Sequence, residues 1–293
     1  MSSVVAHDTL WLSVDEARKL LEARQSGVNE LESSFDLGLT KVKVLLDSEG
    51  VKLPDGRRVS WSMIEEIAGH FRTGRLSNKC FILRGEEVVP IQSYSGYTNR
   101  FYSLLATDGA PTLVAGGFPM HRIKGTDPLK DTAEKIKAIA PVIGKVLDTA
   151  MGLGYTAIMA SKTADEVITV EIDPEVVEIA KLNPWSRELF ENPKIKVIVG
   201  DSFEVIREFP DQYFDRVIHD PPIVSLAGDL YSLDFYKQLY RVIRPRGRLF
   251  HYIGNPEHKM GHRVTRGVVI RLQEAGFKKV VPRPQAFGVV AYK

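Results

Sequence analysis

The chain has little cysteine and no long apolar run, and each shortage excludes some classes of protein. Cys80 is the only cysteine among 293 residues, which excludes an internal disulfide and a cysteine-based zinc site and is typical of a reducing compartment. We expect Cys80 to be buried as an apolar residue rather than to act as a nucleophile. No apolar run approaches the ~20 residues of a membrane span, and residues 1–15 lack the pattern of a secretory signal. We therefore expect a cytoplasmic protein without membrane contact.

Histidine pairs with metal-ligand spacing are also missing. His258 and His262 lie four residues apart, but Pro256 and Gly261 disfavour a helix that would place both on one face. The seven histidines have no accompanying carboxylates in a metal-binding pattern. The sequence therefore predicts no bound metal.

The net charge of +2 hides an uneven distribution along the chain. Residues 237–293 contain 13 Lys or Arg against only Glu257 and Glu274, a net charge of +11, so the total of +2 leaves −9 for residues 1–236. A basic region of this kind attracts a polyanion such as RNA, and a solvated basic face would have the same composition. We predict RNA as a partner of this region, and the sequence indicates no oligomeric state.

From about Lys145 onward, short apolar runs alternate with helical patterns, which predicts strand–helix units around a parallel sheet. The expected strands, seven in all, are 145–150, 167–171, 195–199, 216–219, 248–253, 279–281 and 288–292, and an amphipathic helix at 127–139 precedes them. Earlier residues carry turn signals flanked by alternating apolar residues, as in β-hairpins. We predict an α/β protein with a smaller β-rich, substrate-recognising domain at residues 1–125 and a Rossmann-like domain at residues 126–293.

The first expected strand leads into a glycine-rich loop. Residues 152–157 satisfy the pattern G-x-G-x-x-[GA], and Glu171 follows Gly152 by 19 positions. Glycines let the backbone turn tightly beside a ligand, and a Glu171 carboxylate can accept two hydrogen bonds from a ribose diol. These features suit NAD and S-adenosylmethionine alike. Asp148 favours S-adenosylmethionine, because its charge would repel a pyrophosphate and attract an ammonium group.

Asp201 follows the third expected strand and can accept a hydrogen bond from an adenine amino group. An Asp in this place is also a common helix N-cap. Asp148, Glu171 and Asp201 come at three successive strand ends, where ligands collect in open parallel sheets. Their coincidence favours the binding role.

With these motifs in place, residues from about Asp127 to the end resemble a class I S-adenosylmethionine-dependent methyltransferase, and the whole chain is similar to a family of predicted archaeal methyltransferases. Each motif is short, so the resemblance depends on their order and spacing. It implies a seven-stranded methyltransferase sheet with S-adenosylmethionine as the cofactor. The expected cofactor-binding residues are Asp148, Met151, Gly152, Gly154, Glu171, Ile172, Asp201 and Ser202.

After the fourth expected strand the sequence is His219-Asp220-Pro221-Pro222-Ile223. Its Asp-Pro-Pro resembles the D-P-P-Y motif of methyltransferases that act on amino nitrogens, and the resemblance implies that Asp220 and the Pro221 carbonyl accept hydrogen bonds from the amino group. We expect Asp220, Pro221 and Pro222 to form the catalytic segment. Ile223 replaces the aromatic residue that usually stacks on a flipped base. Two prolines after a strand would also stiffen a loop without any catalytic role.

Four further residues are expected to contact the substrate. His121 and Arg122 lie just before the predicted domain junction, although a lone histidine is more often structural. His219 or Tyr231 could supply the stacking ring that Ile223 does not.

The resemblance implies a methyltransferase, and we predict methyl transfer to an amino nitrogen of a nucleic acid, with RNA preferred. An aminopropyltransferase of the spermidine synthase type is an open alternative, because residues 229–247 are similar to the stretch after the catalytic strand of those enzymes. Against it, a polyamine acceptor calls for an acidic pocket, and the flanking region is basic. A non-catalytic RNA-binding module with this fold is a third reading, but it would not need Asp148, Glu171 and Asp220 together.

Overall fold

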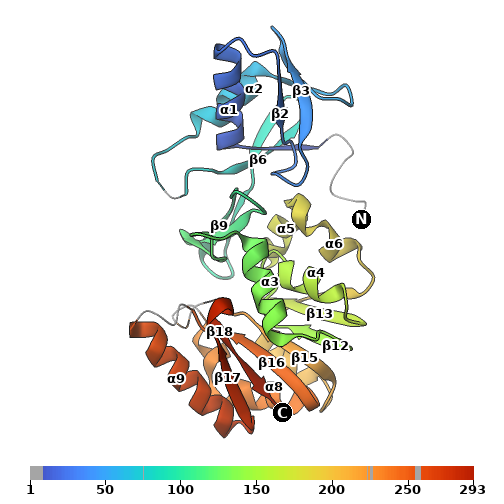
Figure 1. The fold of residues 1–293 in the computed structure, drawn as a ribbon, viewed down its shortest axis with the longest axis vertical. Coiled ribbons are helices and arrows are strands. Elements are labelled where there is room, and N and C mark those ends of the chain that lie inside the picture. Colours follow the sequence, from blue (N-terminus) through green and yellow to red (C-terminus); the bar gives the residue numbers. More distant parts are fainter. Residues whose placement is uncertain (1–8, 75, 223, 225–226, 255–258) are drawn as a thin grey trace. The chain divides into compact units, whose positions relative to one another are not determined.

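The computed structural model describes residues 9–74, 76–222, 224, 227–254 and 259–293, with the backbone alone at 259–263 (Figure 1). The chain forms two compact units, which we call the N-terminal unit (residues 1–128 and 178–185) and the C-terminal unit (residues 129–177 and 186–293). The main boundary follows Pro128 rather than residue 125. A short segment from within the second predicted domain groups with the N-terminal unit.

The described part of the N-terminal unit contains three antiparallel sheets, of order β1-β6-β7, β2-β3-β4-β5 and β11-β10-β9-β8. In chain order its elements are β1 (Leu10–Ser13), α1 (Val14–Gln25), β2 (Glu30–Ser33), β3 (Val42–Leu46), β4 (Gly50–Lys52), β5 (Arg58–Ser60), α2 (Trp61–Gly69), β6 (Cys80–Arg84), β7 (Glu87–Pro90), β8 (Gln92–Ser95), β9 (Arg100–Leu105), β10 (Thr112–Ala115) and β11 (Phe118–Pro119). The predicted β-rich character is confirmed.

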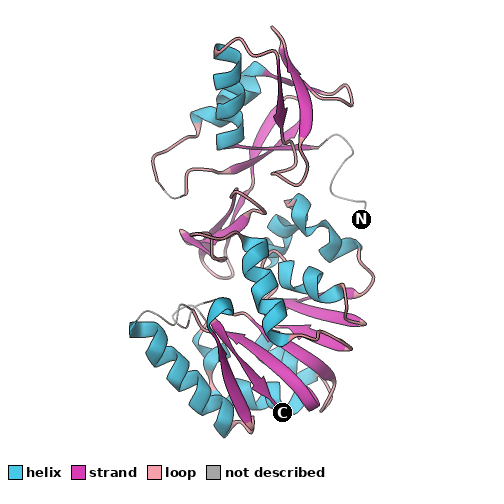
Figure 2. Cartoon of the chain, in the orientation of Figure 1, coloured by secondary structure: helices cyan, strands magenta, loops and turns pink. Residues whose placement is uncertain are grey.

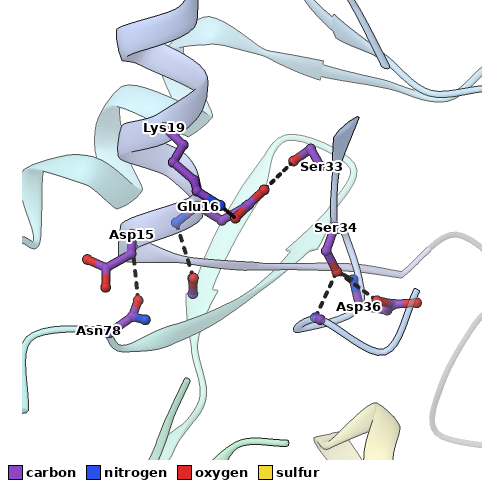
Figure 3. Close-up of polar contacts among 9 residues, drawn as sticks. Asp15, Glu16, Lys19, Ser33, Ser34, Asp36 and Asn78 are labelled. Atoms are coloured by element: carbon purple, nitrogen blue, oxygen red, sulfur yellow. Dashed lines mark hydrogen bonds and ion pairs between the residues drawn. The ribbon is translucent and has the colours of Figure 1, made fainter. Parts of the chain in front are cut away.

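Polar side chains fix the start of α1 (Figure 3). Ser13 Oγ accepts a hydrogen bond from Glu16 N at 3.3 Å, as an N-cap serine does. The Glu16 carboxylate accepts one from Ser33 Oγ at 2.8 Å, and Asn78 Oδ1 accepts one from Asp15 N at 2.9 Å. The apolar faces of α1 and α2 pack onto one buried core, which they share with the neighbouring strands.

The C-terminal unit is built around a sheet flanked by helices (Figure 2). The sheet has seven strands in the order β14-β13-β12-β15-β16-β18-β17. Its strands are β12 (Lys145–Asp148), β13 (Glu166–Glu171), β14 (Ile195–Val199), β15 (Phe214–His219), β16 (Ile243–Tyr252), β17 (Lys279–Arg283) and β18 (Gly288–Tyr292). Strands β12 to β16 are parallel, and β18 is antiparallel to both of its neighbours. The predicted α/β fold is therefore confirmed. Strand β16 begins before the predicted residue 248, because the ladder shifts register beyond Phe214 and takes in Pro245 and Gly247.

The remaining helices are α3 (Pro128–Ile139), α4 (Tyr155–Ser161), α5 (Pro174–Leu182), α6 (Arg187–Glu191), α7 (Ser202–Val205), α8 (Leu233–Val242) and α9 (Lys259–Glu274). Phe235 and Leu239 of α8 and Leu272 of α9 are fully buried in the core beneath β15 and β16. No helix in the described residues has the length and apolar character needed to cross a membrane.

Candidate functional site

The carboxyl ends of parallel strands β12 to β15 lie on one edge of the sheet, where ligands collect in open α/β folds. Four predicted site residues end or follow these strands, and we call this edge the acidic edge: Asp148, Glu171, Asp201 and Asp220. Among the described residues, no three or more His, Cys, Asp or Glu are grouped as a metal ion would require.

The glycine-rich loop between β12 and α4 has two residues in the left-handed region of backbone conformation. Gly152 has φ +52°, and Gly154, which precedes α4, has φ +78°. A Cβ on Gly154 would lie 2.5 Å from Leu189 Cδ2, so glycine is required there. A Cβ on Gly152 would meet no protein atom within 4 Å, which leaves that side of the loop open to a ligand. Met151 is buried.

Asp148 lies beneath this loop. Its Oδ2 accepts hydrogen bonds from the hydroxyls of Thr156 at 2.8 Å and Thr169 at 3.0 Å, and the side chain is fully buried. Burial raises the pKa of Asp148 to about 7, and the two hydroxyl donors act in the opposite direction. The expected contact with a ligand ammonium group does not fit a side chain without exposed surface. Asp148 instead ties α4 and β13 to the loop.

The carboxylate of Glu171 also binds the loop. Its Oε2 accepts a hydrogen bond from Gly152 N at 2.9 Å, and its Oε1 accepts one from Asp173 N at 3.1 Å. Burial raises the pKa of Glu171 to about 7, with these backbone donors opposing the shift. A carboxylate oxygen can accept more than one hydrogen bond, so a ribose contact stays compatible with this geometry. Ile172 beside it is 40% exposed and offers an apolar surface.

Asp201 is the N-cap of α7, and it accepts a hydrogen bond from Phe203 N at 2.8 Å. The helix N-cap role, which was the structural alternative for Asp201, is therefore present. The half-buried carboxylate can serve both purposes, so an adenine contact stays a prediction. Ser202 is buried, and its hydroxyl donates to the Thr149 carbonyl at 2.6 Å, which links α7 to the glycine-rich loop.

Asp220 belongs to a charged cluster that the sequence analysis does not predict. Lys135 Nζ lies 2.6 Å from Asp220 Oδ2 and 2.9 Å from Asp131 Oδ2. The side chains of Lys135 and Asp131 are 2% and 1% exposed, whereas that of Asp220 is 18% exposed. The Tyr252 ring centroid lies 4.7 Å from the same ammonium group. Lys135 is thus enclosed by two carboxylates, one of which reaches the acidic edge.

The charge of Lys135 is maintained by these carboxylates. Burial alone would lower the pKa of Lys135, but the charges of Asp220 and Asp131 outweigh it and raise the pKa above its ordinary value. The sequence does contain a signal for the pair, because Asp131, Lys135 and Ile139 are spaced by four residues on the buried face of α3. An acid and a base on the apolar face of an amphipathic helix indicate a buried ion pair.

The segment after Asp220 begins with the two predicted prolines. Pro221 is buried, Pro222 is half-buried, and the Tyr231 hydroxyl donates to the Pro222 carbonyl at 3.1 Å. Tyr231 is only 5% exposed, so its ring does not form the expected stacking surface, and burial raises the pKa of its hydroxyl. Ile223 lies outside the described residues, as does His258.

His219 is fully buried. Its Nε2 donates to the Leu230 carbonyl at 2.9 Å, and its Nδ1 lies 2.7 Å from Thr149 Oγ1. Burial lowers the pKa of His219 to about 3, so the ring is neutral at physiological pH. The expected substrate contact does not fit a buried ring. His219 instead connects the loop after β12 to the segment after β15.

His121 and Arg122 belong to the N-terminal unit. His121 Nδ1 lies 2.9 Å from Thr112 Oγ1, and the backbone N–H of His121 donates to the same oxygen at 3.3 Å. Both residues are half-buried. Their expected contact with substrate stays a prediction.

Basic residues of the C-terminal region gather at the other end of the strands, near the amino ends of β15 and β16. They are Arg241, Arg244, Arg246, Arg248, Lys278, Lys279 and Lys293. Some of them bind within the protein: Arg244 pairs with Asp215 at 3.0 Å, and Lys293 donates to the Tyr240 carbonyl at 2.7 Å. These seven residues are therefore separated from the acidic edge by the length of the sheet, whereas Arg283 of β17 lies at the same end of the sheet as the carboxyl end of β16. The RNA partner predicted from this region stays a prediction.

Comparisons with known proteins identify relatives of the chain. A family model described as the spermine/spermidine synthase domain matches residues 113–271. An uncharacterized protein of Methanocaldococcus jannaschii is 46% identical over 281 residues, which cover 93% of this chain and 92% of that protein. A polyamine aminopropyltransferase of Sulfurisphaera tokodaii is 34% identical over 105 residues, which cover 33% of this chain and 35% of that protein.

A solved structure shares the fold. The crystal structure of spermidine synthase from Thermotoga maritima matches with a TM-score of 0.55 at 18% identity, over 76% of this chain and 77% of that one. This match concerns the arrangement of helices and strands alone.

These findings correct the functional prediction. Methyl transfer from S-adenosylmethionine to RNA is wrong, because the matching family model is the spermine/spermidine synthase domain and the named relative is a polyamine aminopropyltransferase. The methyltransferase-like fold is confirmed, and the prediction of an enzyme is confirmed at the level of a transferase. Because the family model covers more than half of its length, this chain belongs to the spermine/spermidine synthase domain family.

Proposed function

We propose that this protein transfers an aminopropyl group from decarboxylated S-adenosylmethionine to an amine. The family match and the relatives named as polyamine aminopropyltransferases support this reaction. The alignments with these relatives cover only part of this chain and part of each relative. The geometry and charge of the site must therefore also support the proposed reaction.

The charge of the acidic edge is the observation that carries the proposal. Intact S-adenosylmethionine has a carboxylate that the partly exposed Asp220 would repel, whereas the decarboxylated molecule keeps the ammonium and sulfonium groups without it. An amine acceptor is also a cation at neutral pH. Seven of the thirteen basic residues that argued against an acidic pocket lie near the amino ends of the strands, away from this edge. Both reactants therefore suit the acidic edge.

Asp220 is the group to which we assign the proton transfer. The Asp220 carboxylate first takes one proton from the acceptor ammonium, which frees the lone pair of its nitrogen. The lone pair then forms a bond to the aminopropyl carbon attached to sulfur. The carbon–sulfur bond breaks, its electron pair neutralises the sulfonium, and methylthioadenosine leaves as a neutral thioether. Asp220 suits this role because it combines exposed surface with an acceptor oxygen at the end of β15.

The donor would bind across the neighbouring strand ends. Gly152 leaves one side of its loop open, and Glu171 can accept hydrogen bonds from the ribose diol. Asp201 is assigned to the adenine amino group, with Ile172 as an apolar surface for the nucleoside. The described residues of this edge therefore fit the adenosine half of the donor.

The first test is calorimetric titration with decarboxylated and intact S-adenosylmethionine, followed by mass spectrometry of reactions with putrescine and longer polyamines. We expect tighter binding of the decarboxylated donor, together with equal amounts of methylthioadenosine and an acceptor heavier by one aminopropyl group. Preference for the intact molecule, or a product heavier by one methyl group, would refute the proposal.

Asp220→Asn tests the assigned base. Loss of the proton acceptor should lower kcat by about 10²- to 10⁴-fold, while donor affinity stays within about threefold of the wild type. Asp234→Asn is the matched control, because Asp234 is an exposed acid in α8, with 81% of its side chain accessible. Equal rates for wild type and Asp220→Asn would remove Asp220 from the mechanism.

A further inference from the structure

The cluster of Lys135, Asp131 and Asp220 contains more charge than a structural ion pair needs. Asp131 lies one helical turn before Lys135 in α3, and this pair alone would balance the buried ammonium. Lys135 nevertheless also contacts Asp220, which comes from a different element and is the exposed member of the three. The additional contact therefore joins the buried face of α3 to the residue assigned to proton transfer.

We infer that Lys135 is a positioning residue that keeps the Asp220 carboxylate ionised and in one orientation. The inference rests on the proposed function, in which Asp220 must accept a proton from the acceptor amine. A bond of 2.6 Å from a charged donor to Asp220 Oδ2 restricts rotation of the carboxylate. The ammonium itself has little freedom, because Asp131 and the ring of Tyr252 hold it from other directions.

The electrostatic part of the inference depends on every group that faces Asp220. Asp148 lies close enough for the two carboxylates to disfavour each other's charge. Burial raises the pKa of Tyr231, and the negative charge of Asp220 adds to that shift. His219 is neutral, and Tyr252 contributes a ring near the ammonium. Lys135 places a positive charge 2.6 Å from Asp220 Oδ2. Its loss would move Asp220 toward the protonated form, because Asp148 repels the Asp220 charge and the carboxylate is partly buried.

A double variant tests the inference without leaving an unbalanced charge on α3. Asp131→Asn combined with Lys135→Met removes one positive and one negative charge and keeps side chains of similar size. Lys137→Met is the matched control, because Lys137 belongs to the same helix and 77% of its side chain is exposed. Circular dichroism and thermal unfolding establish that each variant is folded before it is assayed.

Two readouts distinguish a positioning role from a structural one. The first is the titration of the Asp220 carboxyl carbon by ¹³C NMR, assigned by comparison with Asp220→Asn. The second is the pH dependence of kcat/KM for aminopropyl transfer. We expect the double variant to move the Asp220 titration and the acid limb of the rate profile upward by about 1–3 pH units, since an opposite charge lowers a carboxyl pKa by that amount. The control should match the wild type in both.

The two readouts can fail separately. If the wild type transfers no aminopropyl group, the proposed function fails, and the NMR titration still tests the effect of Lys135 on Asp220. If Asp220 titrates at the same pH in the folded double variant as in the wild type, the inference is wrong, whatever reaction the protein catalyses.

Discussion

The imidazole Nε2 of His219 donates a hydrogen bond of 2.9 Å to the backbone carbonyl of Leu230. This contact joins the end of β15 to the residues just before α8. Burial keeps this ring neutral by lowering the pKa of His219 to about 3, and its Nδ1 lies 2.7 Å from Thr149 Oγ1. Protonation would place an unfavourable charge in this buried site, so the connection between the glycine-rich loop and the segment after β15 is sensitive to acid.

His219→Gln should remove one pH-dependent contribution to stability. The folded pKa of His219, about 3, is below the ordinary 6.5, so the unfolded chain binds a proton first as pH falls. The stability is present above pH 6.5 and is lost as the pH decreases toward 3. The difference in free energy of unfolding between wild type and His219→Gln should change by about 1.4 kcal/mol per pH unit between about pH 6 and 4. Urea unfolding measures it, and parallel pH profiles would contradict the expectation.

Lys135→Met alone should destabilise the protein more than the double variant with Asp131→Asn. Removal of one partner from a buried ion pair leaves its counter-charge in an apolar setting, at a cost of about 3–5 kcal/mol. Asp131 is only 1% exposed, so water cannot compensate it. Denaturant unfolding of the wild type, both single variants and the double variant gives the coupling energy. Independent, additive effects would show that the pair does not interact.

Gly154→Ala should be more damaging than Gly152→Ala. Both positions have positive φ, which costs about 1–2 kcal/mol for alanine. At Gly154 the new Cβ would also lie 2.5 Å from Leu189 Cδ2, whereas at Gly152 it meets no protein atom. We expect Gly152→Ala to weaken donor binding with a small loss of stability. Leu189→Ala should partly restore the stability of Gly154→Ala, and the absence of any rescue would argue against the steric explanation.

Cys80 should be unreactive in the folded protein. Its thiol is 1% exposed within β6, and burial raises its pKa above the usual range, so little thiolate forms. A chromogenic disulfide reagent should detect no thiol in buffer and one thiol per chain in denaturant. Rapid reaction of the folded protein would mean that this part of β6 opens readily.

The sequence is sufficient to predict the C-terminal sheet, because each strand is a short apolar run followed by a turn or a helical pattern. It does not predict the full extent of β16, since Pro245 and Gly247 are typical of a turn and the bulge that accommodates them is a tertiary feature. It also assigns Asp148 to ligand binding. The Asp148 carboxylate accepts hydrogen bonds from Thr156 of α4 and Thr169 of β13. The positions of these two donors depend on how the elements pack.

The error in the predicted reaction has a related cause. Methyl and aminopropyl donors share adenosine and a sulfonium, so a glycine-rich loop and an acid after the second strand suit both. The charge count along the chain also favours a polyanion, because it cannot show that seven of the basic residues lie near the opposite ends of the strands. Asp131 and Lys135 were missed for a different reason. Charged residues in an amphipathic helix are expected on the solvated face. The four-residue spacing of Asp131, Lys135 and Ile139 indicates instead that all three share the buried face.

The acids at the carboxyl ends of the strands and the seven basic residues near their amino ends contribute to an electric dipole along the strands of the C-terminal unit. Such a field acts before any contact is made, because it turns and draws a diffusing cation toward the negative end. Its reach is set by the Debye length, about 10 Å at 0.1 M salt. The association rate constant of a polyamine should therefore fall with rising ionic strength, and that of an anion should not follow the same trend.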